Sequence, residues 1–398
     1  MHKTMVRNLA MARLSSSSSF SFLFFTFCIL FIPSCSLGEC QRVGKHVALY
    51  VFGDSFLDSG NNNYINTTTL DQANFRPYGE TFFKFPTGRF SDGRLVSDFI
   101  GVDFVTLVLL GGGVAEYAKL PLISPFLEPG VKKKYDDGVN FASAGAGSLS
   151  QTFQGQVINL CTQLRYYNKV VGLLRQKLGN EEAKKTLSSA VYLFGVGTND
   201  YISLFLTNST FLNSFSNSQY VGMVIGNLTM VIKEVYKKGG RKFGFLNLGP
   251  LGCLPGIRII KPEDNGGCLE EASQLANLHN EALSKLLSQL VNQLKGFKYA
   301  LYDFNSNLRL KMNHPSKYGF KEGKIACCGT GRFRGTFSCG GKRPVKDYEL
   351  CDNPNEYVFW DSFHLTEKVH KQMADQIWNG NPNVVKPYNL KNLFQCLQ

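Results

Sequence analysis

The sequence predicts an α/β fold with a mostly parallel central sheet of about five strands, covered by helices on both faces. Five short apolar runs recur at wide intervals along the chain: Val47–Phe52, Gly138–Ala142, Val191–Val196, Phe243–Leu248 and Tyr299–Phe304. Helical patterns lie between these runs, and strands that are joined through long helical crossovers pair in parallel. The reactive crevice of such a fold is expected at the carboxyl ends of the strands.

The chain begins with the pattern of a secretory signal peptide, to which we assign residues 1–38. Three basic residues precede a short apolar stretch, Phe20–Ile32, and small residues between positions 34 and 38 offer cleavage sites. That stretch is too short for a membrane anchor, and no second span follows. We therefore expect an extracellular protein of the apoplast or cell wall without an integral membrane span. Residues 39–398 contain no Pro- or Ser-rich linker and are assigned to one domain.

The first apolar run ends in Phe52-Gly53-Asp54-Ser55, which places a serine hydroxyl at the end of the first strand. Open α/β folds hold their reactive groups at this edge of the sheet. An ester-cleaving serine also needs a base, a group that orients the base, and donors for the developing oxyanion. The serine alone does not distinguish an active site from an ordinary turn.

The strongest candidate for the base is His364, because Asp361 precedes it by three residues and one turn of chain can bring the two together. The other histidines are weaker candidates: His2 in the signal, His46, His279 inside a helical pattern, His314 before a proline, and His370. The order Ser, Asp, His is one of several that the triad geometry tolerates. Taken alone, D-x-x-H is more often a capping or surface pair. Combined with the strand-end serine, it favours a serine hydrolase.

Two further strand ends offer oxyanion donors. Gly138–Gly147 ends the second strand in small residues, so its backbone can approach a substrate closely. Gly197–Asp200 follows the third strand, and the Asn199 amide could point into the same crevice. Each segment alone could be a simple turn, since Gly and Asn are ordinary turn residues.

The clearest helical pattern covers Leu269 to Leu294. One apolar stripe recurs there at intervals of three or four residues: Leu275, Leu278, Ala282, Leu286, Leu290 and Leu294. Val369, Met373 and Ile377 indicate a last helix directly after His364.

Nine cysteines follow the signal: Cys40, Cys161, Cys253, Cys268, Cys327, Cys328, Cys339, Cys351 and Cys396. In an oxidising compartment most of them should pair, and the odd number leaves at least one thiol free or paired between chains. Cys253 and Cys268 flank one loop, and the cluster from Cys327 closes loops just before Asp361. No C-x-x-C pair occurs, so a metal site is not favoured and we expect no cofactor. Asn66, Asn208 and Asn227 begin N-x-T sequons, which are compatible with glycosylation and equally with bare surface asparagines.

The formal net charge is +13, of which three charges belong to the signal segment. A charge of this sign favours anionic partners such as acidic cell-wall polysaccharide, although a diffuse solvated surface charge is the simpler interpretation. Nucleic acid is not an expected partner, because the chain has an export signal and lacks a basic-aromatic motif.

Several motifs, taken in order, resemble the plant GDSL esterase/lipase family of the SGNH hydrolases: Phe52–Ser55, Asp58–Asn63, Asn140–Gly147, Gly197–Asp200 and Val358–His364. The likeness spans nearly the whole mature chain. It implies a three-layer α/β/α (flavodoxin-like) fold and a secreted serine esterase or lipase that hydrolyses lipid or other acyl esters. Leu365 replaces the proline that is common after this histidine in the family. The sequence from Asp361 to Glu367 resembles that of the family's secreted, defence-associated branch.

The resemblance also implies a role for each candidate residue. Ser55 would be the nucleophile, His364 the base and Asp361 its orienting partner. The oxyanion donors would be the backbone N–H groups of Ser55 and Gly145 and the side chain of Asn199. Two alternatives remain open: transfer of the acyl group to an alcohol at the same site, or a non-catalytic, wall-associated binding protein that uses its basic surface.

Residues 101–114 do not fit their surroundings. Joining Ile100 directly to Ala115 would place Val96, Phe99 and Tyr117 on one helix face, and the family runs through this join without a break. These fourteen residues are therefore either extraneous, as from a retained intron, or a tolerated surface insertion, since long loops cost little closure entropy. Sequencing the transcript distinguishes the two.

Overall fold

The computed structural model describes residues 47–101, 120–130, 133–207, 214–260 and 266–395. The proposed signal, Cys40, Asn208 and Cys396 lie outside these ranges. The segment 101–114 is described only at Gly101, which ends helix α1.

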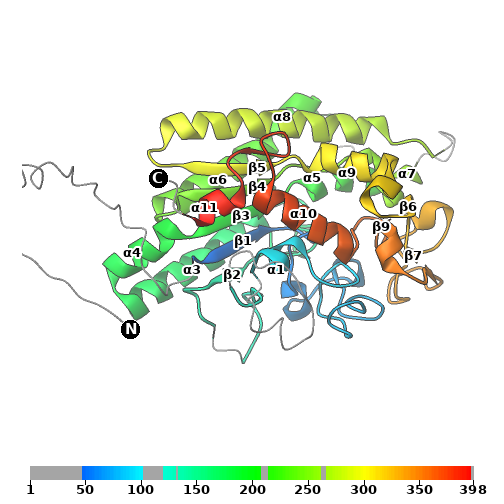
Figure 1. The fold of residues 1–398 in the computed structure, drawn as a ribbon, viewed down its shortest axis with the longest axis horizontal. Coiled ribbons are helices and arrows are strands. Elements are labelled where there is room, and N and C mark those ends of the chain that lie inside the picture. The colour runs from blue at the N-terminus through cyan, green and yellow to red at the C-terminus, as the bar shows by residue number, and fades with distance from the viewer. Residues whose placement is uncertain (1–46, 102–119, 131–132, 208–213, 261–265, 396–398) are drawn as a thin grey trace, which may run out of the picture. The chain divides into compact units, whose positions relative to one another are not determined.

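A six-stranded sheet forms the centre of the described part, with the strand order β10-β5-β4-β3-β1-β2 (Figure 1). Its strands are β1 (Leu49–Gly53), β2 (Gly138–Asn140), β3 (Val191–Gly195), β4 (Lys242–Leu246), β5 (Lys298–Tyr302) and β10 (Val385–Pro387). The first five are parallel, as predicted, and their order 2-1-3-4-5 is the flavodoxin-like one. The sixth, β10, was not predicted. It pairs antiparallel with β5 and contains Pro387, which suits an edge strand.

Both faces of the sheet are buried. Tyr50, Tyr192 and Phe243 are aligned across β1, β3 and β4, and Tyr167 of α3 packs edge-on against the first two. Gly244 points to the opposite face, because successive strand residues alternate, and there a Cβ would lie 3.0 Å from Leu390 of α11. The sheet is therefore covered by α3 on one side and α11 on the other.

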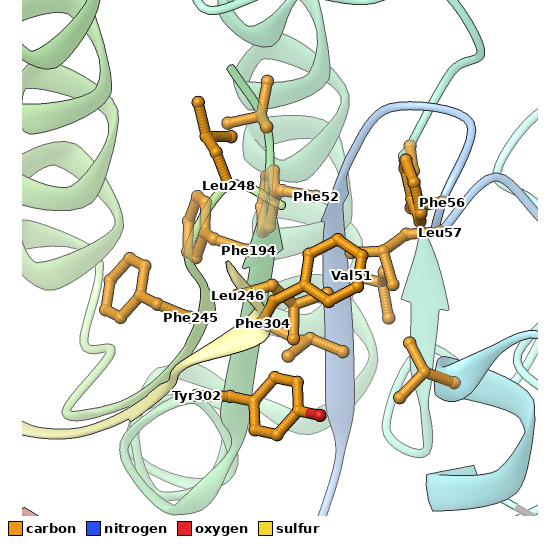
Figure 2. Packing of buried hydrophobic residues seen from close by; sticks show 14 of the residues in the cluster. Val51, Phe52, Phe56, Leu57, Phe194, Phe245, Leu246, Leu248, Tyr302 and Phe304 are labelled. Carbon is orange, nitrogen blue, oxygen red and sulfur yellow. The ribbon is translucent and has the colours of Figure 1, made fainter. Parts of the chain in front are cut away.

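Aromatic rings fill the space next to the carboxyl ends of the central strands. Figure 2 shows Phe52, Phe194 and Phe245 on three adjacent strands. The ring centroids of Phe52 and Phe194 lie 4.8 Å apart, and those of Phe194 and Phe245 lie 5.5 Å apart. This row stabilises the strand ends from which Ser55 and Asn199 follow.

The larger helices form two packed groups. On the α3 side, α6 packs against both α3 and α8; on the α11 side, α10 packs against α1 and α11. The helices are α1 (Val96–Gly101), α3 (Leu160–Leu178), α4 (Asn180–Ser189), α5 (Thr198–Leu206), α6 (Asn217–Lys237), α7 (Pro255–Arg258), α8 (Glu270–Gln293), α9 (Phe304–Asn313), α10 (Glu367–Asn379) and α11 (Leu390–Phe394). No helix of the described residues combines the length and apolar character that a bilayer span requires.

Two predicted helices are present, with one difference in detail. The apolar residues predicted for the last helix are buried in α10, although this helix is not the last, because the short helix α11 follows it. In α8, Leu275 and Leu290 of the predicted stripe are fully buried, but the other most buried positions include Ala276, His279, Leu283 and Leu287, each one residue further along than the stripe. Leu278, Ala282 and Leu286 of the predicted stripe are partly buried against the same core.

A second, smaller region holds the segment that leads to Asp361. Two short sheets occur there, β6 (Glu322–Ala326) with β9 (Tyr357–Phe359), and β7 (Cys328–Gly329) with β8 (Glu349–Leu350). Disulfides join Cys327 to Cys351 and Cys328 to Cys339, and a third joins Cys253 to Cys268. Cys161 carries a free, half-buried thiol. The predicted loop closures before Asp361 are therefore present.

Candidate active site

Ser55 lies in the turn that follows β1, at the carboxyl edge of the sheet. The Asp54 backbone N–H donates to the Gly195 carbonyl at 3.1 Å, which attaches this turn to the end of β3. The Asp54 carbonyl accepts from the N–H groups of Leu57 and Asp58, so a helical turn begins here. Ser55 is thus held by backbone bonds at the point where the strand order reverses between β1 and β3.

His364 reaches this serine although 309 residues separate the two in sequence. Its Nε2 lies 2.8 Å from Ser55 Oγ. Its Nδ1 lies 2.8 Å from Asp361 Oδ1 and 3.0 Å from Oδ2. The structure therefore brings the three residues of the sequence hypothesis into one hydrogen-bonded row.

The local chain explains why the Asp361–His364 spacing works. Asp361 Oδ1 accepts from the backbone N–H groups of Phe363 and His364, both at 2.9 Å. The Trp360 N–H donates to the His364 carbonyl at 2.8 Å, which closes the turn. The carboxylate and the ring consequently face each other within four residues of chain.

The charge of Asp361 determines the direction of these hydrogen bonds. Burial raises the pKa of Asp361, but the adjacent His364 and the Arg343 guanidinium outweigh burial and lower this pKa to about 2. Asp361 is therefore a carboxylate near neutral pH and can only accept, so Nδ1 of His364 donates to it. In a neutral ring, Nε2 is then the acceptor for the Ser55 hydroxyl.

Aromatic rings enclose His364. The ring centroids of Phe90, Phe56 and Phe337 lie 4.6, 5.9 and 6.2 Å from that of the imidazole. These rings exclude water, and a hydrogen bond in such surroundings is stronger than the same bond in water.

The other described histidines are placed differently. His279 is buried in α8 with its Nδ1 2.9 Å from the Tyr201 hydroxyl. Burial lowers the pKa of His279 and of His370 to about 3, so both rings are neutral at physiological pH. His314 is exposed after α9. His46 lies outside the described residues.

The proposed oxyanion donors lie on segments that follow β1, β2 and β3. Gly145 has a φ of 77°, and a Cβ there would lie 2.5 Å from Asp71 Oδ1, so this position requires glycine. Asn199 is in the first turn of α5, where its Nδ2 donates to the Ala146 carbonyl at 3.0 Å. Within the described residues, the backbone N–H groups of Ser55 and Gly145 donate to no protein acceptor. The Asn199 amide also keeps a second N–H.

Buried polar side chains join these three segments, and the sequence analysis assigned them no role. Asp58 accepts from Gly60, Asn61 and Ala144 N–H groups, and Asn62 Nδ2 donates to the Ala144 carbonyl. Asp200 accepts from the N–H groups of Ser148 and Leu149 and from the Thr152 hydroxyl. The density of Asp and Asn in two short segments next to strand ends is the signal that could have identified them.

A small crevice opens beside the nucleophile turn. It is lined by Asp54, Phe56, Gly195, Val196, Thr198, Leu246, Asn247, Leu248 and Phe304. Burial raises the pKa of the Asp54 carboxyl in this wall to about 7. Within the described residues, no group of three or more His, Cys, Asp or Glu side chains is placed to hold a metal ion.

The chain is similar to known proteins over most of its length. The profile of the GDSL-like lipase/acylhydrolase family matches residues 49–377. GDSL esterase/lipase 5 of Arabidopsis thaliana is 58% identical over 95% of this chain and 96% of its own length. GDSL esterase/lipase 2 of the same plant is 53% identical over 89% and 91%, and a GDSL lipase of Tanacetum cinerariifolium is 46% identical over 89% and 90%.

Proposed function

Because this chain belongs to the plant GDSL esterase/lipase family and is a carboxylic-ester hydrolase, we propose that it cleaves esters through an acyl intermediate on Ser55. The observation that carries the proposal is the 2.8 Å separation between Ser55 Oγ and His364 Nε2. Asp361 continues the same row on the far side of the ring.

In the first half of the reaction, His364 Nε2 removes the Ser55 proton as Oγ bonds to the ester carbonyl carbon. The carbonyl oxygen becomes an oxyanion, and the imidazolium that forms is stabilised by the Asp361 carboxylate. Collapse of this intermediate breaks the carbon–oxygen bond to the alcohol, and the Nε2 proton moves to the leaving oxygen. The alcohol departs and the acyl group stays on Ser55.

In the second half, water takes the place of the alcohol. His364 Nε2 removes a proton from this water, whose oxygen attacks the acyl carbon. The second oxyanion collapses, Ser55 Oγ leaves with the proton from Nε2, and the acid is released. In both halves, the Ser55 N–H, the Gly145 N–H and the second N–H of the Asn199 amide stabilise the oxyanion.

A serine-directed phosphonate tests this proposal. We expect a covalent adduct on Ser55, identified by peptide mass spectrometry, and loss of esterase activity in proportion to labelling. Ser55→Ala should abolish both. Ser59→Ala is the matched control, since Ser59 is also buried in this turn and its Oγ has no partner among the described residues. Full esterase activity in Ser55→Ala would refute the assignment.

Two alternatives use other observations. Acyl transfer would share the same intermediate, and adding a primary alcohol to the assay would reveal an ester product in place of the acid. A non-catalytic, wall-associated binding protein would rest on the net charge of +13. Absence of any adduct on Ser55, together with retention on an acidic polysaccharide column, would favour it.

We further propose that the protein is secreted after removal of residues 1–38, with glycans on its sequons. The three disulfides of the described residues support this proposal, because disulfides persist in oxidising compartments. Asn66 is exposed in a loop and Asn227 is half-buried in α6. Amino-terminal sequencing and glycosidase digestion of the protein expressed in plant cells test both points. A panel of short-chain esters, polar lipids and acetylated sugars tests the substrate class.

A further inference from the structure

Asp361 has a second buried partner besides His364. The Tyr78 hydroxyl donates to Asp361 Oδ2 at 2.7 Å, across 283 residues of sequence. Oδ1 is tied by two backbone N–H groups, whereas the contacts of Oδ2 are Tyr78 and the 3.0 Å approach of His364 Nδ1. Tyr78 is therefore the donor that fixes the free end of the carboxylate.

Arg343 is hydrogen-bonded to Tyr78 on the side away from Asp361. Its Nη2 donates to the Tyr78 hydroxyl oxygen at 2.7 Å, and its Nη1 donates to the Thr69 carbonyl at 2.7 Å. Its guanidinium lies 3.8 Å from the centroid of the Phe337 ring, and the residue is fully buried. Among the described residues no carboxylate forms a direct ion pair with Arg343. Its charge lowers the pKa of Asp361, and its hydrogen-bonded connection to Asp361 runs through the Tyr78 hydroxyl.

The order of donors along this row has a chemical consequence. A hydroxyl that accepts a bond from a guanidinium is a stronger donor to the next acceptor, because hydrogen bonds in a chain polarise one another. Burial raises the pKa of Tyr78 well above its ordinary value, so the hydroxyl keeps its proton. The row then runs in one direction, from Arg343 through Tyr78 to Asp361.

We propose that Tyr78 and Arg343 are positioning residues, which hold the Asp361 carboxylate in the orientation from which it directs His364 toward Ser55. This inference rests on the proposed function. Tyr78 and Arg343 are 1% and 0% exposed, so neither can contact a substrate. Their loss should therefore lower kcat and leave KM unchanged.

The first test is Tyr78→Phe, which removes one oxygen and keeps the ring. The matched control is Tyr50→Phe, because the buried Tyr50 hydroxyl also donates a 2.7 Å bond, to the Tyr135 carbonyl in the turn before β2, away from the site. Activity is expressed per active site titrated with the phosphonate, so unfolded protein does not count. We expect kcat of Tyr78→Phe to fall about tenfold, or about 1.4 kcal/mol in the barrier, while the control retains wild-type kcat.

The second test separates Arg343 from Tyr78. Arg343→Met should also lower kcat, and Arg343→Lys should recover part of the loss because it restores the charge. If Arg343 acts through the hydroxyl, the double variant Tyr78→Phe/Arg343→Met loses less than the product of the two single losses. If the two losses in kcat instead multiply in the double variant, Arg343 does not act through the Tyr78 hydroxyl. This conclusion would hold even where both variants are less stable.

The outcomes distinguish this inference from the proposed function. If the wild-type protein gains no phosphonate adduct on Ser55, the proposed function fails. If the wild type is labelled and active while Tyr78→Phe keeps wild-type kcat per titrated site, only the positioning role fails. A purely structural role would lower the melting temperature of Tyr78→Phe without changing kcat. It would also leave unchanged the deshielded NMR resonance of the proton between His364 Nδ1 and Asp361.

Discussion

The two sides of the candidate site are built in different ways. Ser55 and Asn199 follow strands of the central sheet, inside a continuous apolar core that extends through both helix layers. Asp361 and His364 follow β9, whose Val358 and Phe359 belong to the same core. The adjacent Trp360 packs instead in a second, smaller cluster with Ala73, Tyr78, Phe90, Ala144 and four disulfide-bonded cysteines. The nucleophile side is therefore held by the main core alone, and the histidine side by that core together with a cross-linked cluster.

This difference follows from the amount of apolar surface available to each side. A sheet with five parallel strands buries enough apolar surface to be stable without covalent links. Two-stranded sheets cannot do so, and small cores of this kind depend on disulfides. Cys327–Cys351 closes the segment that carries Arg343, and Cys328–Cys339 closes a shorter loop within it. The site therefore joins a part that tolerates local change to a part that depends on its cross-links.

The largest expected effect tests whether the two sides work as one unit. His364→Ala should lower kcat/KM by about 10⁴-fold or more, as should Ser55→Ala. The double variant should be no slower than either single variant, because residues that act as a unit are not additive. Steady-state kinetics of the three variants check this point. Losses that multiply would mean that the two sides contribute separately.

Asn199→Ala tests whether a side chain on the nucleophile side can be removed without loss of stability. Removal of one oxyanion donor should lower kcat by about 10²–10³-fold. Because the sheet core is independent of this side chain, the melting temperature should change little. Esterase kinetics and calorimetry provide the two readouts, and Asn292→Ala, at an exposed position of α8, serves as a control. A large loss of stability with normal kcat would assign Asn199 to structure.

Removal of one cross-link tests the histidine side. Cys328→Ser/Cys339→Ser should destabilise this region by about 2–4 kcal/mol, since the disulfide limits the unfolded chain. On heating, activity should then disappear before the far-ultraviolet circular dichroism of the sheet changes. Cys253→Ser/Cys268→Ser is the matched control with a disulfide of similar span. Simultaneous loss of activity and of the sheet signal would contradict separate stabilities.

The smallest expected effect is that buried carboxyls on the two sides of the site change the folding stability in opposite directions with pH. Burial raises the pKa of Asp54 to about 7 and those of Asp58 and Asp200 to about 6, so the folded state holds protons that the unfolded chain has released. Stability from these groups is therefore greatest near pH 4 and falls as the pH rises toward 7, by up to about 1.4 kcal/mol per pH unit for each group. Asp361 has the opposite sign: its contribution is complete above about pH 4 and is lost as the pH falls through about 2.

Melting temperatures measured from pH 4 to pH 8 test the effect of the buried carboxyls on the nucleophile side. The wild type should melt at lower temperature as the pH rises, and Asp54→Asn should flatten the slope. Asp347→Asn, on the exposed segment between Cys339 and Cys351, should leave the slope unchanged. A melting temperature that rises over this range would contradict the sign derived for the buried carboxyls.

Some features of this protein could be predicted because they depend on residues that are close together in sequence. Strands buried on both faces consist of consecutive apolar residues. The limits of all five parallel strands were therefore predicted to within two or three residues. The Asp361–His364 pair is local as well, because three residues of chain bring the two side chains together. The buried face of α8 was predicted in part: Leu275 and Leu290 are buried, but the positions between them are displaced by one residue, since the packing of α6 and α5 determines which side of that helix is most buried.

The amino-acid sequence by itself therefore determined the parallel sheet, the strand-end serine and the Asp–His pair, because each depends on periodicity or spacing within a few residues. Only the tertiary structure decided that Ser55 meets His364, that β10 adds an antiparallel edge, and that Arg343 and Tyr78 stand behind Asp361. The side-chain contacts among these join positions 265 to 309 residues apart. No local pattern specifies such a pair, because the burial of the intervening sheet and the closed disulfide loops bring its members together.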